Sequence, residues 1–94
     1  MKLSIAAIND MLDKLEGWNL EGSEIYKMFE FPSFADAILF VSQIAERAEA
    51  SDHHPDIDIR YRKVKISLST HSENGLTKKD FMLAGEIDRI KGQM

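Results

Sequence analysis

The chain has 94 residues, enough for one domain and too few for two, so we expect residues 1–94 to fold as a single domain. Hydrophobic residues make up 44% of it and charged residues 30%, a balance that excludes a disordered tail. The net charge of −4, with basic residues scattered along the chain, argues against nucleic acid as a partner.

Two further exclusions concern disulfides and membranes. The chain has no cysteine, and a domain of this size buries only about 60 to 68% of its unfolded surface, so self-association is an expected route to further burial. The apolar run near the amino terminus stops at Asn9, too early for a secretory signal, and no stretch approaches the roughly 20 residues of a membrane span. We expect a cytoplasmic protein with no membrane partner.

The first predicted element is a helix that follows Ser4, its N-cap, and continues to about Leu15, with Gly17 as its stop. Spacings of three and four residues place its apolar side chains on one face, which we expect to be buried. These side chains are Ile5, Ile8, Leu12 and Leu15.

A β-hairpin is predicted next, between Trp18 and Glu30. The side chains alternate with a period of two along this stretch, and residues 21–23 can turn the chain. The second strand of the hairpin is expected to run from Glu24 to Phe31.

The longest predicted helix follows Ser33, which is placed to act as its N-cap. Apolar residues form one stripe over about four turns, and the stripe consists of Phe34, Ala37, Ile38, Val41, Ile44, Ala45 and Ala48. Leu39 and Phe40 lie partly off this stripe. We expect both to be exposed on a monomer, as a second helix surface that a partner covers.

Two strands and a helix complete the pattern. The strands are predicted over Asp56–Tyr61 and Lys63–Thr70, and the helix begins at Thr77, with Asp80 where the carboxylate of a capping box belongs. The order of elements predicts an α+β fold in which three helices pack on one face of a four-stranded antiparallel sheet.

The three histidines are the candidates for chemistry. His53, His54 and His71 flank the last pair of strands, so the pairing of those strands can bring them together. Such a cluster suits proton transfer near neutral pH, and it also suits a zinc ion or no role at all. Because His54 precedes Pro55 and is biased toward an extended conformation, the side chains of His53 and His54 should point to opposite sides.

The spacing of seven residues resembles the signature of the pterin-4a-carbinolamine dehydratases, also known as the dimerisation cofactor family. The residues that carry the resemblance are Glu49, His53, His54, Pro55, Tyr61, His71 and Asp80. The likeness extends over nearly the whole chain. It includes Gly17-Trp18, the Phe29-x-Phe31-x-x-Phe34 segment, residues 45–55 and 64–71, and Gly75-Leu76-Thr77.

The resemblance implies dehydration of 4a-hydroxytetrahydropterin to the quinonoid dihydropterin and water. The C4a hydroxyl group leaves only when it is protonated, and N5 must lose its proton as the new double bond forms, so the reaction needs an acid and a base. The family uses no metal and no cofactor, and none is expected here.

The resemblance also assigns roles to residues. His53, His54 and His71 match the histidines of the family's active site, and Asp80 matches its carboxylate. Contacts with the pterin are expected for His54, Pro55, Glu49, Trp18, Ser69 and Thr70. We expect His71 and His53 to carry out the proton transfers and His54 mainly to bind.

Alternatives remain at this level. Asp80 could serve only as a helix cap, and Trp18 only as a core or interface residue. Some relatives are protein-interaction modules that stabilise or modulate a transcription factor, and a role near molybdopterin metabolism is a further alternative. We expect a homodimer or homotetramer, with a foreign protein as a second kind of partner.

Overall fold

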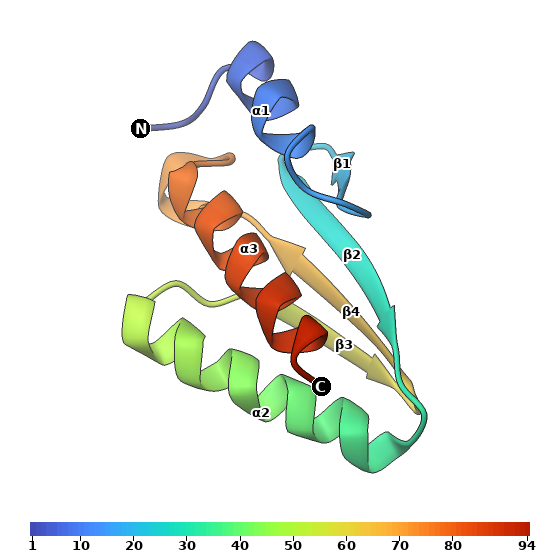
Figure 1. The fold of residues 1–94 in the computed structure, drawn as a ribbon. Helices are drawn as coiled ribbons and strands as arrows, with labels where there is room; N and C mark the ends of the chain where they lie inside the picture. Colours follow the sequence, from blue (N-terminus) through green and yellow to red (C-terminus); the bar gives the residue numbers. More distant parts are fainter.

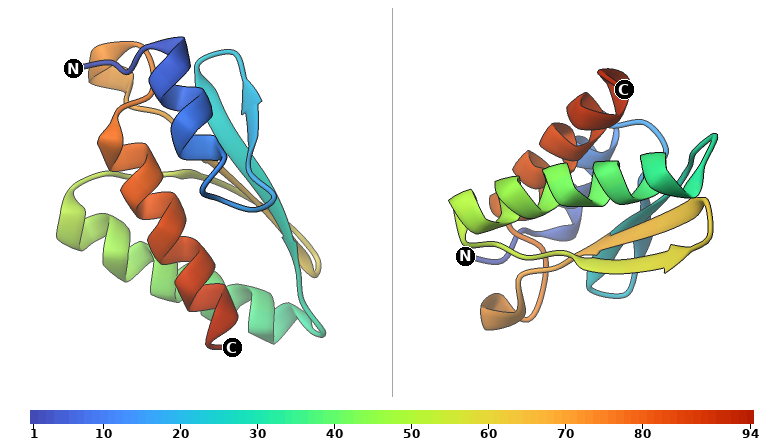
Figure 2. Two further views of the ribbon diagram at one scale, coloured as in Figure 1. Left: turned by 45° about the horizontal axis from the view of Figure 1, so that its top comes forward. Right: turned by 90° about the horizontal axis from the view of Figure 1, so that it is seen from below.

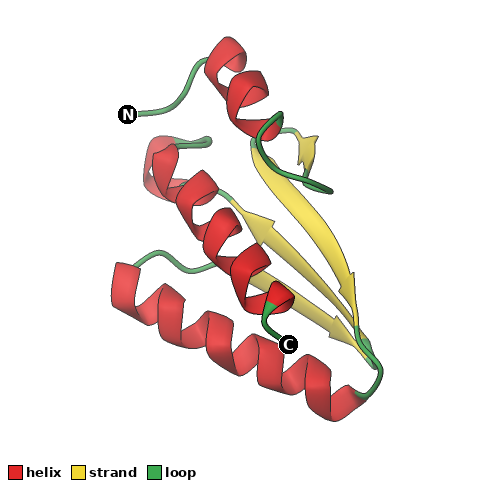
Figure 3. Cartoon of the chain, viewed as in Figure 1, coloured by secondary structure: helices red, strands yellow, loops and turns green.

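The computed structural model describes all 94 residues. The elements in chain order are α1 (Ile5–Leu12), β1 (Asn19–Glu21), β2 (Glu24–Glu30), α2 (Phe34–Ser51), β3 (Asp56–Arg60), β4 (Lys63–Leu68), a short 3-10 helix η1 (His71–Glu73) and α3 (Lys78–Gly92). The strands form one antiparallel sheet in the order β1-β2-β4-β3 (Figure 1). The helices and strands of Figure 3 follow the predicted order, so the predicted fold class is confirmed.

The core lies between the sheet and the helices, and α2 and α3 cover the same face of the sheet (Figure 2). Because side chains alternate along a strand, one face of each strand supplies the core. On that face Ile25 pairs with Leu68 and Phe29 with Val64, and all four side chains are buried. None of the three helices combines the length and the apolar character that a bilayer crossing requires.

The buried face of α2 differs from the predicted stripe, because it includes Phe40 and leaves out Phe34, Ile38 and Ala45. Phe40 is 0% exposed, and its ring centroid lies 4.9 Å from those of both Phe29 and Phe31, whereas its neighbour Leu39 is 50% exposed. The expectation that Phe40 is exposed is therefore wrong. The sheet contacts the helix along the spacing of three and four that links Ala37, Phe40 and Ile44, which turns Ile38 to the surface.

The first helix is shorter than predicted and buries less. α1 ends at Leu12, after which Leu15 donates its amide to the Leu12 carbonyl in a tighter 3-10 bond. Ser4 is the N-cap as predicted, and its hydroxyl accepts from the amide of Ala7. Only Ile8 is buried, and Ile5 is 75% exposed, because just one ridge of so short a helix reaches the core.

The strands β3 and β4 also end earlier than predicted. Tyr61 lies in the turn between them with a φ of 54° and its side chain exposed, so it is neither a strand residue nor a core residue. β4 ends at Leu68, and Thr70 then forms an isolated bridge with Gly75. This bridge closes a short loop, and His71 therefore starts η1 instead of extending the strand.

Candidate active site

His53 and His54 lie in the loop that joins α2 to β3. Asp52 ends α2 in the left-handed conformation, with a φ of 49°, and the amide of His53 donates to the carbonyl of Ala48 at 3.1 Å. This C-terminal cap reverses the chain and directs His53 toward the interior. His53 is buried and His54 is exposed, so the two side chains diverge in the structure as predicted.

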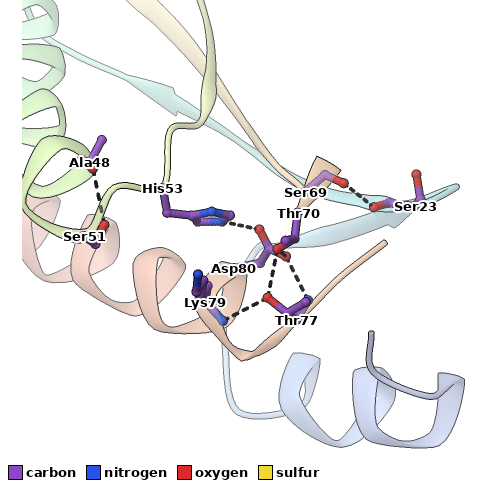
Figure 4. A network of polar contacts seen from close by, with 9 residues as sticks. All are labelled: Ser23, Ala48, Ser51, His53, Ser69, Thr70, Thr77, Lys79 and Asp80. Atoms are coloured by element: carbon purple, nitrogen blue, oxygen red, sulfur yellow. Dashed lines mark hydrogen bonds and ion pairs between the residues drawn. The ribbon is translucent and has the colours of Figure 1, made fainter. Parts of the chain in front are cut away.

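The ring of His53 contacts a fully buried carboxylate. Its Nε2 lies 2.7 Å from Oδ1 of Asp80, which is 0% exposed, and the two residues are 27 positions apart in the chain. Figure 4 shows the pair between the α2–β3 loop and the first turn of α3. Because no solvent reaches Asp80, its carboxylate can influence a reaction only through its protein neighbours.

Asp80 also caps α3, so the helix cap and the contact with His53 occur in the same geometry. Its Oδ2 accepts from the backbone amide of Thr77 at 2.9 Å and from the hydroxyl of Thr70 at 2.8 Å. The hydroxyl of Thr77 accepts in turn from the amide of Lys79, which completes the capping box. The carboxylate is thus fixed by a helix terminus and by the end of a strand.

The other two histidines are at the surface. The Nε2 of His54 is hydrogen-bonded to Oε2 of Glu49 on α2, and both side chains are exposed. His71 is exposed at the start of η1, directly after Thr70, whose hydroxyl reaches Asp80. The chain connection therefore places the backbone of His71 next to Thr70, one member of the network that holds His53.

Several residues expected to contact a ligand make contacts with other residues of the protein. The indole N–H of Trp18 donates to Asp88 at 2.9 Å, and the buried ring meets Phe29 edge-on at a centroid distance of 6.3 Å. Asp88 lies about two turns along α3 from Asp80, so Trp18 is a core residue outside the histidine site.

The hydroxyl groups that follow β4 are also hydrogen-bonded within the protein. Ser69 donates to the carbonyl of Ser23 at 3.0 Å, and Thr70 points inward to Asp80. Pro55 is half-buried and follows the exposed His54.

Two hollows flank the polar network, and Lys79 lines both. One, of about 100 Å³, is formed by His53 with Ser51, Lys79, Met82, Leu83 and Glu86. The other, of about 740 Å³, is formed by the amino-terminal segment with Thr70, Thr77 and Lys79, and no histidine lines it. Only the larger hollow reaches the usual volume of a ligand pocket, roughly 300 to 1,000 Å³.

Sequence reasoning missed two residues of this site. The sequence places Thr77 only at the start of the last helix and in the Gly75-Leu76-Thr77 match, and it does not single out Lys79, although both lie within three positions of Asp80. No three histidine, aspartate or glutamate side chains are arranged so that they could bind a metal ion.

A family model described as pterin 4 alpha carbinolamine dehydratase matches residues 1–90. The chain belongs to this family. A dehydratase of this name from Roseiflexus sp. strain RS-1 is 56% identical over 89 residues, which cover 95% of this chain and 96% of the relative. Another from Chloroflexus aurantiacus is 50% identical over 91 residues, 97% of this chain and 98% of the relative.

Two solved structures share the fold of this chain. A transcriptional coactivator/pterin dehydratase from Brucella melitensis matches with a TM-score of 0.92 and 37% identity, over 96% of this chain and 98% of that one. A pterin dehydratase-like protein described as a RuBisCO assembly factor in the alpha-carboxysome matches with a TM-score of 0.67 and 22% identity, over 80% and 87% of the two chains. At that identity the second likeness concerns the fold alone.

Proposed function

We propose that this protein removes water from 4a-hydroxytetrahydropterin and gives the quinonoid dihydropterin. The observation that carries the proposal is the buried hydrogen bond between His53 and Asp80, in a chain about half identical to dehydratases over almost its full length. A histidine oriented by a carboxylate is a common arrangement for a general acid or base. We further propose that the protein acts on a small pterin in the cytoplasm.

The reaction requires two proton transfers and no change in oxidation state. The bond between C4a and its hydroxyl oxygen breaks, and that oxygen leaves as water after it receives a proton. The N–H bond at N5 breaks, its proton goes to a base, and the electron pair forms the double bond between N5 and C4a. Each positioned acid or base increases the rate by a factor of about 10² to 10⁴.

His53 and His71 are proposed as the acid and base, and His54 as a residue that binds the pterin. His53 is held by Asp80, and His71 lies next to Thr70, which contacts the same carboxylate. His54 is exposed and is hydrogen-bonded to Glu49 at the surface, where a ligand can reach it. Glu49 and Pro55 are proposed to line the pterin site beside it.

A dehydratase assay tests the proposal directly. We expect the wild-type protein to accelerate loss of water from 4a-hydroxytetrahydropterin above the spontaneous rate, and the double variant His53→Ala/His71→Ala to return it to that rate. We also expect the rate to be undiminished after exhaustive chelation. A wild-type rate equal to the spontaneous one contradicts the proposed function, and a tightly held zinc ion whose removal abolishes turnover contradicts the metal-free mechanism.

A second candidate function is binding of a protein partner. The exposed apolar side chains of Ile38 and Leu39 on α2 provide a surface for it, and the Brucella melitensis relative is described as a transcriptional coactivator. We propose that another copy of this chain covers the surface first, as a dimer or a dimer of dimers. An assembly that forms without substrate and keeps full dehydratase activity is compatible with both functions.

A further inference from the structure

The donor and the acceptor in each hydrogen bond around Asp80 can be assigned by counting the protons that each group has. A threonine hydroxyl has one proton to donate and can accept through its oxygen. Thr70 donates its proton to Oδ2 of Asp80 at 2.8 Å. In the 2.8 Å contact between the Thr70 and Thr77 hydroxyls, Thr77 must therefore be the donor. The Thr77 oxygen accepts from the Lys79 amide, so all donors point one way, toward the carboxylate.

Every hydrogen bond that reaches Asp80 is compatible with an ionised carboxylate. Its Oδ2 accepts from the Thr70 hydroxyl and from the Thr77 amide. An ionised carboxylate has no proton to give, so its Oδ1 can only accept from the ring of His53, 2.7 Å away. With Asp80 ionised, the proton of that contact belongs to Nε2 of His53.

The other ring nitrogen of His53 is the one available for chemistry. Nδ1 has no hydrogen-bond partner, yet no buried side-chain nitrogen or oxygen in the protein lacks a partner. It follows that Nδ1 reaches solvent although the residue as a whole is only 9% exposed. With Nε2 protonated, neutral His53 presents a lone pair at Nδ1, because the two ring nitrogens of a neutral histidine have opposite roles.

We infer that Thr70 is a positioning residue that holds Asp80, and through it His53, so that Nδ1 of His53 exchanges a proton with the pterin. The inference rests on the proposed dehydratase function for its last step, the transfer to the substrate. Thr70 itself does not contact the pterin through its hydroxyl, because that group is directed to Asp80 in the interior (Figure 4).

The first test measures the tautomer of His53 and needs no activity. ¹⁵N NMR of the free protein, at a pH where His53 is neutral, should show the proton on Nε2. In Asp80→Asn the amide oxygen should stay with its two donors, Thr70 and Thr77, and the NH₂ group should face His53. The proton should then move to Nδ1, as in a histidine whose aspartate partner becomes an asparagine in a serine protease.

Two outcomes of this test overturn the inference. One is a proton on Nδ1 in the wild-type protein, and the other is an unchanged tautomer in a folded Asp80→Asn variant. Neither outcome depends on turnover. A protein with the expected tautomer and no dehydratase activity would therefore contradict the proposed function while leaving the assignment of the nitrogens intact.

The second test uses a matched pair at residue 70. Thr70→Val keeps the shape and removes the donor, whereas Thr70→Ser keeps the hydroxyl. We expect kcat to fall about tenfold or more in Thr70→Val with little change in KM, the size of effect that loss of one hydrogen bond to a charged group produces, and to recover in Thr70→Ser. The positioning role is overturned if Thr70→Val has the same kcat as the wild-type protein, or if kcat falls equally in both variants. Circular dichroism establishes that both variants are folded.

Discussion

Adjacent histidines in this chain have opposite environments, and that difference predicts different kinetic behaviour. His53 is buried against Asp80, and His54 is at the surface beside Glu49. We expect His53→Ala and His71→Ala to lower kcat with a modest change in KM, because both remove groups proposed to act in the transition state. His54→Ala should mainly raise KM, because it removes a binding contact.

Steady-state rates of the three variants, with single-turnover rates to exclude limiting product release, decide this division. Equal kcat losses at all three positions would mean that the histidines act as one unit. A kcat loss confined to His54→Ala would reverse the roles of His53 and His54.

The contacts of Asp88 lead to a second prediction at the scale of single residues. This carboxylate accepts from the indole of Trp18 and from the ammonium group of Lys27, both at 2.9 Å. Asp88→Ala leaves the indole N–H without its partner, so we expect the free energy of unfolding to fall by about 1 to 3 kcal/mol. Denaturant titration measures it.

We expect the dehydratase kcat and KM of Asp88→Ala to stay near wild-type values under conditions where the variant is folded. That outcome follows from the place of Trp18 in the core. A large rise in KM with an unchanged fold would instead point to contact between Trp18 and the pterin.

At the scale of elements, the orientation of α2 gives the clearest stability prediction. Phe40 is 0% exposed between two other aromatic rings, whereas Phe34, on the same helix, is half exposed. Phe40→Ala should lower the free energy of unfolding by about 3 to 5 kcal/mol, because it removes a buried ring and leaves a cavity. The matched control Phe34→Ala should cost less than about 1 kcal/mol. Similar losses for the two variants would contradict the orientation.

Most of the elements could be predicted because their signals are local. Ser4 and Thr77 cap their helices as expected, and the alternation after Trp18 became the predicted hairpin. The buried face of α2 could not be fixed in this way, since two neighbouring stripes share Ala37 and Ile44. Which stripe is buried depends on where the helix crosses the sheet, and that is a tertiary property.

The candidate site was predictable to the same degree. The resemblance to the dehydratase signature pointed to both His53 and Asp80, and the bias before Pro55 predicted that His53 and His54 diverge. The inward direction of Thr70 could not be predicted, because it depends on β4 ending at Leu68 and on the bridge to Gly75. The predicted strand continues to residue 70, and such a strand gives no reason to expect that the Thr70 hydroxyl points to Asp80.

At the scale of the whole molecule, the apolar surface on α2 predicts self-association. Ile38 and Leu39 are exposed on the single chain, and β1 and β3 lie at the two edges of the sheet. We expect sedimentation equilibrium at micromolar concentration to give two or four times the mass of one chain, with contacts through a sheet edge and the outer side of α2.

Leu39→Glu places a charge on that surface and should shift the assembly to smaller species, whereas Ile5→Glu, an exposed position on α1, should not. A wild-type protein that sediments as one chain contradicts the prediction. If Leu39→Glu leaves the assembly unchanged, the copies contact each other through another surface than that of Ile38 and Leu39.

The pairing of β2 with β4 at the centre of the sheet has a consequence for how the protein is made. β2 is synthesised well before β4, and α2 and β3 come between them, so the sheet cannot be completed on a growing chain until most of the sequence has been translated. The carboxylate of Asp80 comes later still. A nascent chain that ends before α3 therefore has three histidines but no partner for His53, so the proposed site cannot assemble until α3 has been made.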